Sequence, residues 1–117
     1  MKILLLALLL LGVGSRAVAQ APAAPAYDST TRYSVPQLRA DLAYVRRALE
    51  EVHPALYWYT PQDSLNQVFA RAEATLTHPL SEPAFWRQLQ ALVGQVHCGH
   101  TRVRHSAAYR AWFRRQP

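Results

Sequence analysis

The chain has 117 residues, half of them hydrophobic, and its 13 lysine and arginine residues against 7 acidic residues give a formal net charge of +6. This length allows at most one small domain. The single cysteine, Cys98, excludes an intramolecular disulfide, so a domain of this size depends on its core or on additional protein for stability.

The first 19 residues have the pattern of a secretory signal peptide. Lys2 gives a positive start, residues 3–13 are an almost unbroken apolar run, and Ala17 and Ala19 form the small-x-small pattern of a cleavage site. The apolar run is shorter than the roughly 20 residues that span a bilayer, which makes a retained anchor the weaker alternative. We therefore expect residues 1–19 to be removed and the protein to be exported, periplasmic or secreted, with no membrane attachment after cleavage.

Residues 20–33 are expected to form a disordered linker. They begin with alternating alanine and proline, and they lack apolar periodicity. Proline favours extended, solvated conformations, so this composition is typical of a spacer between a cleavage site and a folded domain.

Residues 34–97 are expected to form a domain of three amphipathic helices. The first begins after Ser34, which forms a capping box with Gln37, and ends near His53, because Pro54 disfavours helical geometry in the residue before it. In all three helices apolar residues recur at steps of three and four, which predicts one buried face for each. These inner faces consist of Leu38, Leu42, Val45, Leu49 and Val52; of Leu65, Val68, Phe69, Ala72 and Leu76; and of Phe85, Leu89, Leu92, Val93 and Val96.

The second and third helices have start signals of their own. Thr60 is expected to cap the second helix, with Pro61 at its first position, and His78 with Pro79 is expected to end it. Ser81 is expected to cap the third helix by the same rule.

The link between the first two helices is unusually aromatic. Tyr57, Trp58 and Tyr59 follow one another in it. Large aromatic side chains usually pack against a core, so packing is the expectation here. A platform on which a ligand stacks is the functional alternative.

Residues 98–117 are expected to contain the start of a strand and a short helical tail. The alternation that begins at Thr101 favours a strand to Arg104, and Ser106 can cap a last helical turn. A lone strand has no neighbour to satisfy its backbone. We therefore expect a mainly α fold that leads into the first strand of a missing α/β domain, and we hypothesise that the chain is the truncated front of a longer protein.

Two histidines flank the only cysteine in the run of His97, Cys98, Gly99 and His100. With His105 they offer zinc ligands, but neighbours on an extended segment point to opposite faces and do not converge on one ion. We expect no metal site and no cofactor.

A nucleophile and base pair is the other chemistry that these residue types could perform. Cys98 or Ser106 would need a nearby histidine and a third group to orient its ring, yet no acidic residue follows Glu82. Ser106 is better explained as a helix cap, so no self-contained active site is expected. The same lack of acidic residues leaves a basic C-terminal end, which we interpret as a solvated edge without a nucleic-acid partner.

Three pieces of the chain have a family pattern: the run Glu-Val-His-Pro-Ala-Leu-Tyr at 51–57, the pair Phe85 and Trp86 in a helix leading to Leu92, and the motif Gly99, His100 and Thr101. Together they make residues 42–103 resemble the N-terminal helical segment of the tail-specific (C-terminal-processing) and tricorn-like serine peptidases. Cys98 departs from the family pattern, since an aspartate is common at that position.

The resemblance implies peptide-bond hydrolysis by a serine that lies far downstream, in an α/β catalytic domain. In the tricorn-like branch, a histidine at the position matched by His100 acts as the base, so His100 is the one catalytic residue that the resemblance assigns. A base without its nucleophile has no proton to take, so residues 1–117 alone are expected to be inactive. The implied partners are the remainder of a longer peptidase chain and a peptide or protein substrate.

Two alternatives remain open. One is a free-standing exported binding module that uses the aromatic loop at 56–59 and the basic residues between Arg110 and Arg115. The other is a segment of a decayed pseudo-enzyme, which the sequence does not distinguish from the peptidase fragment.

Overall fold

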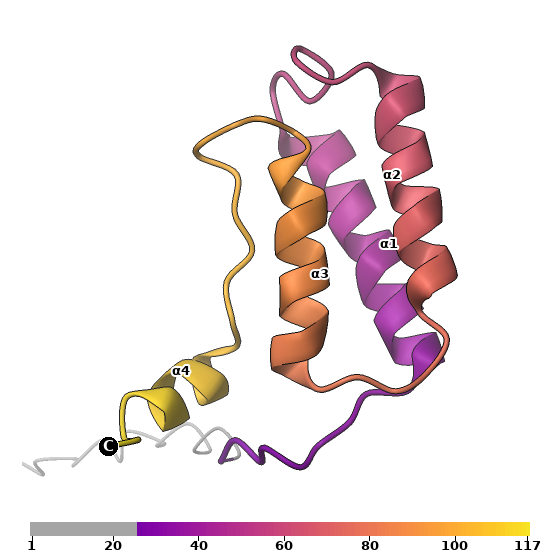
Figure 1. Cartoon of the computed structure of the whole chain (residues 1–117). Coiled ribbons are helices and arrows are strands. Elements are labelled where there is room, and N and C mark those ends of the chain that lie inside the picture. The colour runs from indigo at the N-terminus through magenta and orange to yellow at the C-terminus, as the bar shows by residue number, and fades with distance from the viewer. Residues whose placement is uncertain (1–25) are drawn as a thin grey trace, which may run out of the picture.

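The structure, a computed structural model, describes residues 26–117 and contains four helices in that range (Figure 1). Helices α1 (Val35–Val52), α2 (Gln62–Thr75) and α3 (Glu82–Gly94) form an up-down-up bundle, and α2 packs against both of the others. A short helix, α4 (Ala107–Phe113), lies beyond the bundle at the end of an extended segment. The fold is mainly α, as predicted. The signal peptide expected at 1–19 and the first part, residues 20–25, of the linker expected at 20–33 lie outside the described residues.

Helix α1 has the boundaries that its sequence predicts. The Gln37 side-chain oxygen accepts hydrogen bonds from the backbone N–H and the hydroxyl of Ser34, both at 2.9 Å. The helix ends at Val52, and His53 leaves helical geometry before Pro54. These signals are local in the sequence, which is why they can be read from it.

Helix α2 begins differently from the prediction. Its N-cap is Pro61, and the capping role predicted for Thr60 is wrong. The Thr60 side chain is buried, and its hydroxyl donates to the backbone carbonyl of Gln95, at the C-terminal end of α3. The last carbonyls of a helix have no partner within the helix, so Thr60 satisfies one of them and fixes the α1–α2 link onto α3.

The core consists of the inner faces of the three bundle helices together with residues of their connections. The predicted faces are confirmed, with the exception of Val52, the last residue of α1, which is 78% exposed. The buried hydrophobic residues are Leu38, Leu42, Leu49, Leu56, Leu65, Phe69, Leu76, Leu80, Phe85, Leu89, Leu92, Val93 and Val96.

Residues 26–33 are more ordered than the predicted linker. Asp28 accepts hydrogen bonds from the backbone N–H and the hydroxyl of Thr30, at 2.8 and 2.7 Å, which makes a turn. Tyr33 and Leu80 then form an antiparallel bridge, with N–H to O distances of 2.9 and 3.2 Å. The bridge joins the entry of α1 to the connection before α3, so the prediction of disorder is wrong for this part of the linker.

The strand predicted at 101–104 is also wrong, since the part of the chain that the structure describes contains no strand beyond that single bridge. The segment is extended but runs alongside α3 rather than beside another strand (Figure 1). The carbonyl of Val103 accepts from the indole N–H of Trp86 at 3.0 Å, and the N–H of Val103 donates to the side chain of Gln90 at 3.3 Å. The side chains of Trp86 and Gln90 thus satisfy the backbone of Val103, as a neighbouring strand would.

The burial of the core predicts that the same substitution, valine to alanine, has different effects on the free energy of unfolding at Val96 and at Val52. Val96 is 1% exposed, so Val96→Ala removes buried methyl groups and leaves a void, and we expect it to lower the free energy of unfolding by about 2 kcal/mol. The exposed Val52 is the matched control, and Val52→Ala should change stability by less than about 0.5 kcal/mol. Urea denaturation of both variants measures the difference. Equal losses would contradict the burial of Val96.

Candidate functional site

A groove lies between α1 and the extended segment 100–106, with α3 beneath it. It consists of two cavities, of about 490 Å³ at the His100 end and about 390 Å³ at the Glu82 end. Both cavities are lined by Tyr44, Val45 and Val103, so they are adjacent parts of one apolar groove. The predicted motif residues His100 and Thr101 line its first cavity.

The His100 end of the groove brings together residues from two distant parts of the chain. His53 follows the last turn of α1, and it lines the same cavity as His100 and Thr101. His53 is partly buried, and its Nδ1 accepts a hydrogen bond from the N–H of Ala55 at 3.2 Å. His53 was not predicted as a site residue, although the run at 51–57 that contains it is part of the family resemblance.

The loop that presents His100 is set by the end of α3. The N–H of His97 donates to the carbonyl of Gly94 at 3.1 Å, and His97 has a left-handed backbone with φ of 57°. Glycine is the usual residue for such a reversal. Gly99 has no positive φ, and a Cβ at Gly99 would meet no atom within 4 Å. The residue of this loop with the left-handed backbone is therefore His97 and not Gly99.

Cys98 is a partly exposed free thiol that packs against the core. Hydrogen bonds with the Thr101 side chain, the His100 backbone and the His53 side chain, in that order, lower the pKa of Cys98 to about 6. Because Nδ1 of His53 accepts from a backbone N–H, a neutral His53 ring has its proton on Nε2. That N–H is the donor that a neutral His53 ring can offer to the Cys98 sulfur.

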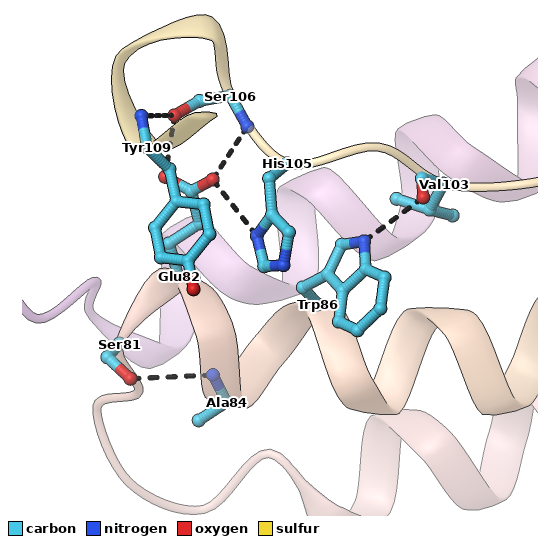
Figure 2. A network of polar contacts seen from close by, with 8 residues as sticks. All are labelled: Ser81, Glu82, Ala84, Trp86, Val103, His105, Ser106 and Tyr109. Carbon is cyan, nitrogen blue, oxygen red and sulfur yellow. Dashed lines mark hydrogen bonds and ion pairs between the residues drawn. The ribbon is translucent and has the colours of Figure 1, made fainter. Parts of the chain in front are cut away.

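The opposite end of the groove contains a carboxylate that binds the C-terminal segment. Glu82, the first residue of α3, accepts hydrogen bonds from the N–H and the hydroxyl of Ser106, at 2.6 and 2.8 Å (Figure 2). The Ser106 oxygen in turn accepts from the N–H of Tyr109 at 3.0 Å. The Ser106 hydroxyl is thus bound on both sides, and its predicted role as the cap of α4 is confirmed.

His105 lies in the same cluster but is held by stacking. Its ring lies between Trp86 and Tyr109, with centroid distances of 4.3 and 4.0 Å. Its Nδ1 lies 3.4 Å from a Glu82 oxygen without the alignment of a hydrogen bond (Figure 2). The Ser106 hydroxyl points to Glu82 and not to His105, so these residues anchor the tail and do not form a nucleophile and base pair.

The aromatic loop differs from its expected packing. Leu56 is buried, but Tyr57, Trp58 and Tyr59 are 39, 77 and 67% exposed. The expectation that they pack is wrong, because the buried residues of this link are Leu56 and Thr60 and the three aromatic side chains lie at the surface. None of the three lines the groove. They remain candidates for ligand contact at a separate surface.

Neither a metal cluster nor a membrane span is found in the range 26–117. No three histidine, cysteine, aspartate or glutamate side chains there are close enough to share an ion. None of the four helices has the length and hydropathy to cross a bilayer. Comparisons with known protein families, with curated proteins and with solved structures find no match to this chain.

The lowered pKa of Cys98 predicts unusual reactivity at slightly acidic pH. Cys98 is the only cysteine, so the rate of alkylation by iodoacetamide reports its thiolate directly. We expect the rate to rise with a midpoint near pH 6 and to level off above it. Thr101→Val removes the largest cause of the lowered pKa and should move the midpoint upward, whereas Thr77→Val, at a remote exposed position, should not. A wild-type midpoint at pH 8 or above would contradict this environment.

Proposed function

We propose that the chain is the N-terminal helical part of an exported serine peptidase, inactive alone, in which His100 acts as the general base for a serine outside these 117 residues. The observation that carries the proposal is the position of His100. It is exposed, it lines one end of an apolar groove, and no group in residues 26–117 hydrogen-bonds its ring. A base needs a ring nitrogen free to take a proton, and this ring has one.

The other histidines of the groove differ from His100 in this respect. The ring of His53 accepts a backbone hydrogen bond, and His105 is stacked between two aromatic rings. Both have contacts typical of structural histidines. The family resemblance assigns the base role to His100, and the environment of each ring supports the same choice.

The groove supports a peptide or protein as the substrate. Its walls are mostly apolar, and Tyr44 on α1 is 63% exposed along it. An extended peptide has apolar side chains to bury and a backbone to pair, and a groove of this kind can accept both. No cofactor is required for hydrolysis by a serine, a histidine and an oxyanion site.

The base role predicts a specific loss of turnover. In the protein encoded by the coding sequence extended past Pro117, His100→Ala should lower kcat about 100-fold or more with folding intact. His78→Ala, at an exposed histidine outside the groove, is the matched control and should leave kcat unchanged. Peptide hydrolysis and thermal unfolding of each variant make the comparison. Unchanged turnover in His100→Ala, or a stop codon with no serine-containing α/β domain in any downstream frame, would contradict the proposal.

A free-standing exported binding module is the second candidate, and one observation favours it. Trp58 and Tyr59 are neighbouring aromatic residues, and both are largely exposed. Exposed aromatic clusters often mark interaction surfaces. Cooperative urea unfolding of a monomer would favour this module, whereas a molten, aggregating product would favour a peptidase segment that needs its missing domain.

A further inference from the structure

The extended segment at 101–105 has two different sides. Thr101, Val103 and His105 are partly buried, and the residues between them, Arg102 and Arg104, are exposed. This alternation is the side-chain pattern of a β-strand. The partly buried side faces the bundle, since Val103 packs against the hydrophobic core and His105 stacks on Trp86 of α3. The segment therefore has the side-chain alternation of a strand, and no strand in the range 26–117 pairs with it.

The backbone of the segment also has two different edges. In a strand, the N–H and C=O of one residue point to one edge, and those of the next residue point to the other. Both groups of Val103 are bound by α3, through Gln90 and Trp86. The N–H and C=O groups of Arg102 and Arg104 consequently point away from α3, and none of these four groups has a hydrogen-bond partner within the described range.

We propose that this free edge binds an extended peptide by strand addition, and that the preferred peptide has acidic side chains at alternate positions. Main-chain hydrogen bonds supply the affinity in this binding mode, and alternate side chains supply the specificity. Arg102 and Arg104 extend from the same face, and neither forms an ion pair with an acidic residue in the range 26–117. Acidic residues opposite them make favourable cross-strand pairs.

The opposite face of the bound peptide is apolar for a related reason. Thr101 and Val103 are the partly buried residues of the segment and line the groove, so peptide side chains on the same face lie over the groove as well. Exposed apolar surface is available there from Tyr44 and Val52. The preferred ligand is thus an extended peptide in which acidic and apolar residues alternate.

A second copy of this chain is a poor occupant of the same edge. Two copies paired through their 101–105 segments would place arginines opposite or diagonal to arginines, and like charges in those positions destabilise a pair. A foreign acidic peptide avoids this repulsion. A peptide paired with the segment passes beside His100, but the pairing requires no catalytic role for His100 and is tested separately from it.

A labelled peptide tests the charge preference. The probe is a fluorescein-labelled heptapeptide of alternating valine and glutamate, titrated with the protein produced from the full 117-residue sequence, with anisotropy as the readout. We expect saturable binding, and binding at least about tenfold weaker when lysine replaces glutamate. Equal affinity for the two peptides, or no binding of the acidic one, would overturn the proposal.

Two substitutions at one position separate backbone pairing from charge. Arg104→Ala removes the charge and keeps the N–H, whereas Arg104→Pro removes both and leaves the two Val103 hydrogen bonds in place. We expect the proline variant to bind about tenfold more weakly than the alanine variant, with unchanged circular dichroism. If both variants bind alike, charge alone accounts for binding and strand addition is wrong.

A modified peptide keeps the test decisive if the proline variant does not fold. N-methylation of every second backbone amide removes the donors from one edge of the peptide, so two such peptides, methylated on opposite edges, are compared with the wild-type protein. If only one of the two methylated peptides loses binding, the result supports backbone pairing through that edge of the peptide. The proposal would be overturned if both methylated peptides bound as tightly as the parent peptide. It would also be overturned if sedimentation showed dimers of the free protein that the peptide does not dissociate.

Discussion

Three side chains on the outer face of α3 hold the last part of the described chain in place. Glu82, Trp86 and Gln90 are four residues apart, so they form one stripe along the helix. They hydrogen-bond Ser106 and both backbone groups of Val103. The inner face of the same helix supplies four core residues. One face of α3 thus packs into the core of the bundle. The opposite face hydrogen-bonds the extended backbone, as a neighbouring β-strand would.

The groove and the site at its end follow from this stripe. Helix α3 holds the segment 100–106 alongside α1. The groove lies between this segment and α1, and its walls are mostly apolar. The left-handed turn at His97 then returns the chain toward the end of α1, where His53, Cys98 and Thr101 interact. The stacking of His105 on Trp86 and Tyr109 joins α4 to the same stripe. The position of His100 therefore depends on contacts at both ends of the segment.

Local signals could be read from the sequence, and contacts between distant residues could not. The caps at Ser34, Ser81 and Ser106 depend on residues three positions away, and they were predicted. Thr60 has the type and place of a cap, but its partner is 35 residues distant. Alternation at 101–104 correctly predicts an extended backbone, because it reports which side chains are buried, but it does not report whether a strand or a helix binds that backbone. The four-residue spacing of Glu82, Trp86 and Gln90 predicts that they lie on one face of α3. It does not predict that this face binds Val103 and Ser106.

Helix α3 binds one edge of the extended segment and leaves the other free. Amide hydrogen exchange tests it most directly, because the N–H of Val103 donates to Gln90 while those of Arg102 and Arg104 have no acceptor in the described range. After correction for intrinsic rates, Val103 should exchange about tenfold or more slowly than its two neighbours, and Gln90→Ala should remove most of that difference. Equal exchange rates at the three positions in the wild-type protein would contradict the account.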